Sequence, residues 1–147
     1  MAAWNMDITS ANSSAVLSVQ EIAPNGIQLE GYSTDQSISS EAVDIAETRM
    51  GVDGNMAAGY VPAIKPVTIT LESNSPSYPR LCEIWEASQT NRTIYPCTLT
   101  VMIPSIRQAF TYSNGILKNG SPFPTHAKVL EPTTWQFDFE RVERTAI

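Results

Sequence analysis

The chain has 147 residues, and its 15 acidic and 9 basic side chains give a formal net charge of −6. This length suits one domain, residues 1–147, that can fold without disulfides or metals, while the acidic balance argues against a protein that grips nucleic-acid phosphates. No apolar run approaches the roughly 20 residues of a membrane span and no signal peptide is recognisable, so we expect a protein made in a cytoplasm without membrane insertion.

The first predicted elements are an arm and a hairpin. Residues 1–13 are small and polar with few apolar anchors, which predicts an arm that is either frayed or docked on a neighbouring subunit. Residues 15–22 then alternate as a strand, the sequence Pro24-Asn25-Gly26 predicts a turn, and residues 27–32 alternate as the returning strand.

Residues 33–60 predict a long edge hairpin with its tip near Asp53-Gly54-Asn55, because glycine tolerates the positive φ of tight turns. Apolar side chains near this tip favour a contact between subunits, since exposed apolar tips and unpaired edges promote association. The alternative is a tip that folds back over its own core. The predicted inter-subunit contact residues are Met50, Val52, Asp53, Met56, Ala57 and Tyr60.

A strand and a helix follow the hairpin. Residues 67–72 alternate between apolar and polar side chains, which predicts a strand with one buried and one wet face. The helix can begin at Ser75-Pro76 or at Tyr78-Pro79 and should end near residues 89–91. Leu81, Ile84 and Trp85 lie at helical spacing, so this helix should cover a sheet face.

The remaining residues predict further strands. One runs from Thr93 to Ile103 with a break at Pro96, another covers 106–112 and closes at a turn over 113–115, a second turn lies at 118–122, and 128–130 form a short strand. Residues 133–142 alternate aromatic and polar side chains. The class is mainly β: an antiparallel β-sandwich or partly closed barrel with one short flanking helix and a long projecting hairpin.

The residues offer little for catalysis, so we expect no enzyme and no catalytic, cofactor or metal site. The single histidine, His126, lies in a predicted loop, and neither a nucleophile elbow nor a phosphate-binding glycine pattern is present. Cys82 and Cys97 have no metal or redox spacing, which favours two reduced thiols over a disulfide.

Three motifs in this order resemble the tail tube proteins of contractile-tailed bacteriophages: Met50-Gly51-Val52-Asp53-Gly54, Val67-Thr68-Ile69-Thr70-Leu71 and Asn74-Ser75-Pro76-Ser77. The resemblance covers roughly residues 14–142. It implies a virion structural protein, assembled in the host cytoplasm, whose hexameric rings stack into the hollow tail tube through which DNA enters the host. The implied partners are other copies of the chain and the tail sheath, baseplate, tape-measure and tail-completion proteins. DNA passes without specific binding.

In such a ring, the wet face of the strands at 67–72 and 133–142 should line the hole, because polar and acidic groups do not hold a polyanion. The predicted lumen-facing residues are Thr68, Thr70, Glu72, Gln136, Asp138 and Glu140.

Three alternatives stay open. The first is the tube of a related contractile injection system. The second is a monomeric β-sandwich that binds sugar or protein in an aromatic cleft around Tyr60, Trp85, Tyr95 and Tyr112. The third is a hydrolase that uses His126.

Overall fold

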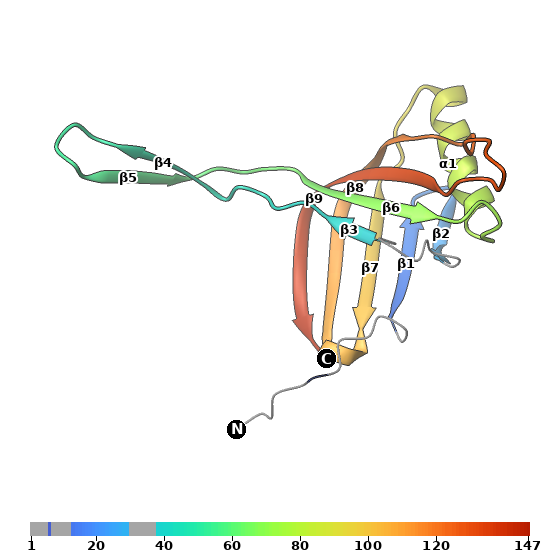
Figure 1. The fold of residues 1–147 in the computed structure, drawn as a ribbon, viewed down its shortest axis with the longest axis horizontal. Helices are drawn as coiled ribbons and strands as arrows, with labels where there is room; N and C mark the ends of the chain where they lie inside the picture. The colour runs from blue at the N-terminus through green and yellow to red at the C-terminus, as the bar shows by residue number, and fades with distance from the viewer. Residues whose placement is uncertain (1–5, 7–12, 30–37) are drawn as a thin grey trace.

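The computed structural model describes residues 6, 13–29 and 38–147, which form a curved antiparallel sheet, a separate two-stranded hairpin and one α-helix (Figure 1). The sheet has seven strands in the order β2-β1-β7-β8-β9-β6-β3, and the hairpin is β4-β5. The strands are β1 (Ser14–Val19), β2 (Ala23–Gln28), β3 (Ile38–Ser40), β4 (Ala46–Met50), β5 (Met56–Tyr60), β6 (Lys65–Leu71), β7 (Cys97–Ile103), β8 (Gln108–Gly120) and β9 (Thr133–Ala146). The helix is α1 (Tyr78–Asn91), and a short 3₁₀ turn, η1 (Pro104–Ile106), joins β7 to β8.

The two longest strands, β8 and β9, belong to both halves of the sheet. The first half of β9 pairs with β6, and the sheet then bends, so that β6 crosses the direction of β1 and β7 (Figure 1). The predicted class, mainly β and antiparallel with one helix and a long projecting hairpin, is confirmed. The seven strands form one curled sheet, which corresponds to the partly closed barrel among the two predicted forms.

The core fills the concave side of this curl. Val67, Ile69 and Leu71 are fully buried on β6, as the two-residue period predicted, and the register places Val67 opposite Phe137 and Ile69 opposite Trp135. Leu17 on β1 and Leu99 on β7 extend this layer across the sheet. A single hydrophobic cluster therefore joins both halves of the sheet.

Helix α1 starts at the second of the two predicted positions, with Pro79 in its first turn, and ends at Asn91, as predicted. Leu81 and Ile84 are buried, whereas Trp85 is only partly buried against the core. The helix covers the core, as expected, through its two aliphatic side chains more than through its tryptophan.

Several predicted boundaries are wrong, chiefly because Asn and Gly permit irregular strands as well as turns. β1 ends at Val19 and turns near Glu21, which has a φ of 73°, so Gly26 lies inside β2 with a φ of 94°. β8 continues through the predicted turn at 113–115, where Asn114 has a φ of 53°. Residues 128–130 form no strand. The predicted arm, apart from Met6 and Ser13, lies outside the described residues. So do residues 30–32 at the end of the predicted strand at 27–32 and residues 33–37 at the start of the predicted long hairpin.

Two glycines of β8 lie directly under aromatic rings of β9. Gly115 is paired with Phe139 and Gly120 with Trp135. A Cβ atom at Gly115 would lie 2.1 Å from Cδ1 of Phe139, and one at Gly120 would lie 2.3 Å from Cε3 of Trp135. The rings pack flat against the β8 backbone only because these positions carry no side chain.

We expect Gly115→Ala to destabilise the fold by about 1–3 kcal/mol or more, because Phe139 must leave its position to admit the methyl group. The measurement is urea unfolding followed by tryptophan fluorescence. Gly59→Ala on strand β5 is the matched control, since nothing lies within 4 Å of that position. Equal unfolding midpoints for the two variants would contradict the packing described here.

Candidate functional site

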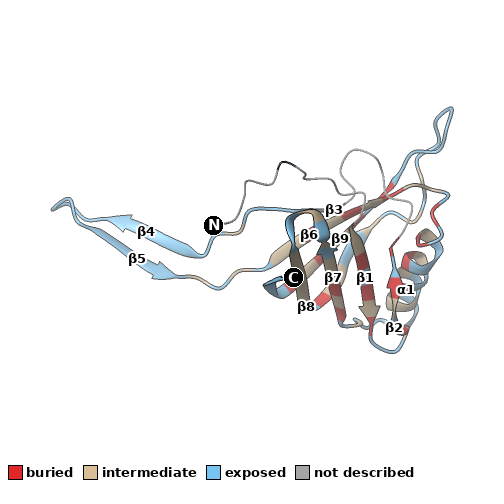
Figure 2. Ribbon diagram, turned by 90° about the horizontal axis from the view of Figure 1, so that it is seen from below, coloured by how far each residue is buried: buried red, intermediate tan, exposed pale blue. Residues whose placement is uncertain are grey.

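The hairpin β4-β5 extends away from the sheet and contacts none of the core. All ten residues of its two strands are exposed, and Figure 2 shows the projecting ribbon in the exposed colour along both strands. A two-stranded hairpin has marginal stability alone in water. Its extended, exposed shape therefore indicates a surface that binds another molecule. The alternative prediction, in which the tip folds back over its own core, is wrong.

The two faces of the hairpin differ in chemistry. Met50 pairs with Met56, and Ala46 pairs with Tyr60, which puts these side chains on one side. Their exposed fractions include 66% for Met50, 65% for Met56 and 76% for Tyr60. We call this side the methionine face: Ala46, Thr48, Met50, Met56, Ala58 and Tyr60.

The opposite side of the hairpin carries two charges and two small residues. Arg49 pairs with Ala57, and Glu47 pairs with Gly59. Of the six predicted contact residues, the structure therefore brings Met50, Met56 and Tyr60 onto one face and places Ala57 on the other.

The remaining two predicted contact residues, Val52 and Asp53, lie in the turn. The Gly51 amide donates to the Asn55 carbonyl at 2.9 Å, and the Gly54 amide donates to the Gly51 carbonyl at 3.0 Å. The Asp53 carboxylate accepts from the Asn55 backbone amide at 3.1 Å and from the Asn55 side chain at 3.0 Å. These two bonds, the backbone one first, lower the pKa of Asp53 from its usual value near 3.8. The tip thus presents a fixed carboxylate beside the fully exposed Val52.

A second surface is the convex, polar side of β3, β6, β9 and β8. Thr68 on β6 pairs with Gln136 on β9 and with Ser39 on β3. Across the next strand, the Asn119 amide nitrogen donates to Oε1 of Gln136 at 3.0 Å. One row of short polar side chains therefore crosses four strands, and we call this side of the sheet the polar face.

The carboxylates of the polar face are partly compensated. Oδ2 of Asp138 lies 3.8 Å from Nζ of Lys118, and Oε2 of Glu140 accepts from Nδ2 of Asn114 at 3.0 Å. All six residues predicted to face a lumen belong to this side or its ends: Thr68, Thr70, Gln136 and Asp138 lie near its middle, with Glu72 just after β6 and Glu140 beside the hairpin base.

The structure also holds a cleft that the sequence did not predict, between the hairpin base and β9. Its volume is about 610 Å³, and it is lined by residues 60, 62–65, 114 and 138–142. β6 stops pairing with β9 at Lys65, opposite Phe139, and the preceding segment, which contains Pro62, diverges. Nζ of Lys65 donates to the Ala63 carbonyl at 2.8 Å and to the Glu140 carbonyl at 3.1 Å, and so joins the two sides.

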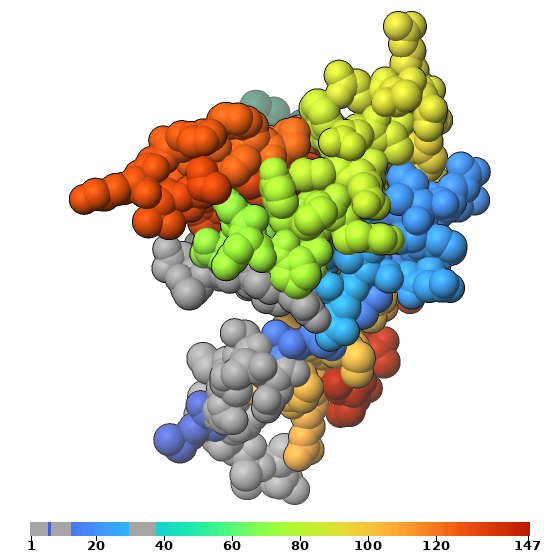
Figure 3. Space-filling view, turned by 90° about the vertical axis from the view of Figure 1, so that its right-hand side faces the viewer, coloured from blue at the N-terminus to red at the C-terminus, as the bar shows by residue number. Residues whose placement is uncertain are grey.

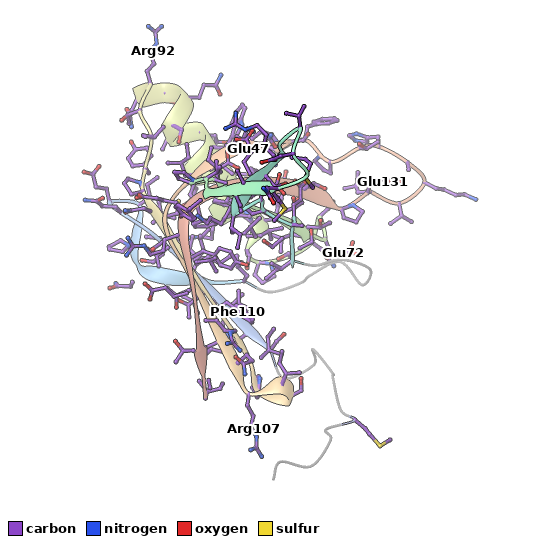
Figure 4. All side chains as sticks on the ribbon, turned by 90° about the vertical axis from the view of Figure 1, so that its left-hand side faces the viewer. Glu47, Glu72, Arg92, Arg107, Phe110 and Glu131 are labelled. Carbon is purple, nitrogen blue, oxygen red and sulfur yellow. The ribbon has the colours of Figure 1, made fainter. Side chains whose placement is uncertain are left out.

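The second unpredicted feature is an edge of β9: beyond Phe139, no strand of the described residues pairs with it on the side of β6. We call it the free edge of β9. Its residues 140–146 are all exposed and extend past the last pair with β6. Figure 4 shows this end of the sheet, with Phe110 of β8 and Arg107 marking how far it reaches from the helix. A long unpaired edge is a template for pairing with another chain. The sequence analysis missed this edge because it ended the strand at residue 142, whereas β9 continues to Ala146. The alternation from Trp135 was predicted correctly.

The aromatic cleft expected for a binding module does not form. Trp85, Tyr95 and Tyr112 pack against the core, while Tyr60 stands on the hairpin. His126 lies in the exposed loop after β8, its ring centroid 5.0 Å from that of Phe123. Within the described ranges, no three His, Cys, Asp or Glu residues gather as a metal site.

Both cysteines are free thiols. Burial raises the pKa of Cys97 to about 11, and burial also raises the pKa of Cys82. Both shifts favour the protonated thiol, and Cys97 is also shielded by burial, whereas Cys82 is partly exposed.

Helix α1, the one α-helix of the described residues, is too short and too polar to cross a membrane.

A family model described as "Tail fiber protein gp32" matches residues 6–143. No curated protein matches the chain.

Among solved structures, a chain of the six-fold symmetrised baseplate of the anti-feeding prophage has a TM-score of 0.63 at 10% identity, with 97% of this chain and 98% of that chain covered. A chain of the cap that terminates the anti-feeding prophage tube has a TM-score of 0.59 at 12% identity, with 100% and 96% covered. A chain of the sheath–tube complex of an extracellular contractile injection system has a TM-score of 0.54 at 12% identity, with 90% and 88% covered. The fold is thus that of proteins in contractile injection particles.

We expect the Asp53 carboxyl to titrate below its usual range in an NMR pH titration, because the folded turn stabilises its charged form. The turn is stabilised above the pKa of the unfolded chain, and this stabilisation is lost as the pH falls through the lower folded pKa. Asn55→Ala removes the side-chain bond but keeps the backbone one, so the Asp53 pKa should rise only part of the way. An unchanged titration in this variant would show that the side-chain bond has no effect.

Proposed function

The chain belongs to the family described as tail fiber protein gp32, and on this premise we propose that it assembles into stacked hexameric rings that form the hollow tail tube of a contractile-tailed bacteriophage. DNA passes through this tube into the host, and the protein is located in the virion tail after assembly in the host cytoplasm. The family is one of tail structural proteins, in agreement with the expectation that the chain is not an enzyme.

The observation that carries the proposal is the hairpin β4-β5, which exposes an apolar face and touches none of its own core. The methionine face suits burial against a neighbouring copy, because Met is apolar and adapts its shape to irregular surfaces. The free edge of β9 gives each copy a further site for a neighbour within a ring. One contact patch repeated by rotation closes a ring, and another repeated along an axis extends a tube.

The polar face supports a second part of the proposal, that it lines the lumen. Its row of Ser39, Thr68, Gln136 and Asn119 offers hydroxyl and amide groups, and its carboxylates repel phosphates. Lys118 is paired with Asp138, so this cation is partly neutralised for a passing strand. A surface of this kind lets a polyanion slide without a strong binding site.

Two features favour a tube over the fiber that the family description names. The fold is that of chains from the tube-terminating cap and the sheath–tube complex, and the chain matches nearly their whole length. The sheath, baseplate, tape-measure and tail-completion proteins are the partners that follow from this place in the tail. The tube of another contractile injection system is the second candidate, favoured by the same similarity, and the identity of the particle that carries the chain decides between the two.

We expect the double variant Met50→Asp/Met56→Asp to remain folded and to lose assembly, because two carboxylates would be buried at the contact without partners. The measurement is negative-stain microscopy together with sedimentation velocity, in which the parent chain forms rings or tubes with a central hole. Ile94→Asp is the matched control, since Ile94 is 64% exposed and distant from the hairpin. Tubes from the double variant would remove the methionine face from the interface, and solid fibers from the parent chain would overturn the tube.

We expect Asp138→Lys/Glu140→Lys to preserve tube assembly and to slow genome ejection, since repulsion is replaced by phosphate contacts that weaken with salt. Glu72 is left unchanged because it lies at the end of the polar face, in a separate recess. The measurement is DNA release from particles at low and high salt. The control, Glu83→Lys/Glu86→Lys, changes the same charge on helix α1, away from the polar face. Normal ejection at low salt from the first variant would place these residues outside the lumen.

A further inference from the structure

The hairpin and the loop of residues 121–132 lie at opposite ends of the polar face. β6 begins beside the hairpin and ends at Leu71, which pairs with Thr133, the first residue of β9 after the loop. In Figure 1 the hairpin projects on one side and the loop on the other, and Figure 3, seen from the loop side, shows it protruding from that surface. The tip and the loop of one chain therefore cannot touch each other.

The loop displays apolar side chains although it is firmly attached. The Ser73 hydroxyl donates to the Glu131 carbonyl at 2.7 Å, the Glu131 amide donates to the Thr125 carbonyl at 3.1 Å, and the Tyr78 hydroxyl donates to the Pro122 carbonyl. The exposed apolar side chains include Phe123 at 66% and Val129 at 80%. The loop thus keeps these apolar side chains exposed to solvent. Exposed apolar side chains that gather in one place are typical of an interaction surface.

Beside the loop is a recess with two apolar lining residues, Val129 and Leu130. Its volume is about 390 Å³, and it is lined by Glu72, Ser73, Asn74, Val129 and Leu130. Its accessible wall is mainly apolar, as suits a tip with an exposed Val52. Figure 4 shows Glu72 and Glu131 on the side of the molecule where the recess lies.

The two ends offer one pair of opposite charges, on a side of the molecule that also carries Glu72 and Glu131. The tip carries the Asp53 carboxylate, held in its charged form by Asn55. The loop carries the exposed Lys128 one residue before Val129. An apolar contact with an adjacent ion pair fixes both affinity and register, because charge complementarity selects among similar apolar contacts.

We propose that the hairpin tip of one copy docks on the loop at 121–132 and the recess beside it in the next copy along the tube. This inference rests on the proposed tube function and names the surface that receives the hairpin. The contact is heterologous: each copy donates one tip and receives another, so the interface propagates along the axis and leaves unfilled sites only at the two ends of the tube. The occupant is a second copy of this chain, since only a copy carries the matching tip.

The test is a disulfide between the two surfaces in assembled tubes. The variant Val52→Cys/Val129→Cys is made in a Cys82→Ser background, with Cys97 kept because it is buried. Under mild oxidation it should give a ladder of covalent multimers on a non-reducing gel, because each copy links to one above and one below. The control pair, Val52→Cys/Ile94→Cys, places the second thiol at another exposed position away from the loop, with 64% exposure against 80% for Val129, and should give no ladder.

The outcomes separate this inference from the proposed function. Tubes that form without a ladder, or that give one only with the control pair, overturn the docking site and leave the tube intact. A parent chain that forms neither rings nor tubes overturns both. The single variant Val129→Asp gives an independent check: it should keep the parent melting temperature and form rings that fail to stack, and normal tubes from it would overturn the docking site.

Discussion

The packing of three aromatic side chains of β9 against the rest of the sheet is the interaction on which the structure depends. Trp135, Phe137 and Phe139 are fully buried and alternate along one face of the strand. Two of them lie on Gly120 and Gly115 of β8, and the register also brings Phe137 opposite Val67 of β6. The rings thus pack on both neighbours of β9 and join them in one hydrophobic core.

The same alternation creates the polar face. Because successive side chains point to opposite faces, burying the aromatic row turns Gln136 and Asp138 outward in a fixed register with Thr68. The polar face is therefore the necessary other side of the core. The hairpin is different, since it belongs to neither face of the large sheet and all ten residues of its strands are exposed.

The sequence predicted those parts of the fold in which local chemistry decides the outcome. The period of residues 67–72 and of Trp135 to Phe139, the turn at Asp53-Gly54 and the end of α1 were all correct, because each depends on alternation, positive φ or helical spacing. The strand β2 and the long β8 were misread, since Asn-Gly pairs serve bulges as well as turns and only strand pairing distinguishes them.

The candidate surfaces divide in the same way. The methionine pair at the tip and the wet face of β6 could be found from the order of side chains alone. The cleft beside Lys65, the free edge of β9 and the recess beside Val129 could not, because each arises where segments distant in sequence part or meet. The position of each of these surfaces depends on the residue at which two strands stop pairing. The pattern of side chains along one strand does not give that residue.

The bridge made by Lys65 has a mechanical consequence. Its ammonium group holds one carbonyl of the segment leading from the hairpin and one carbonyl of β9, in bonds strengthened by the charge. Rotation of the hairpin about its base would stretch the bond from Lys65 to the Glu140 carbonyl. The lysine therefore helps to fix the angle between the hairpin and β9. A force applied at the hairpin tip would therefore reach the strand that carries Asp138 and Glu140 through this lysine.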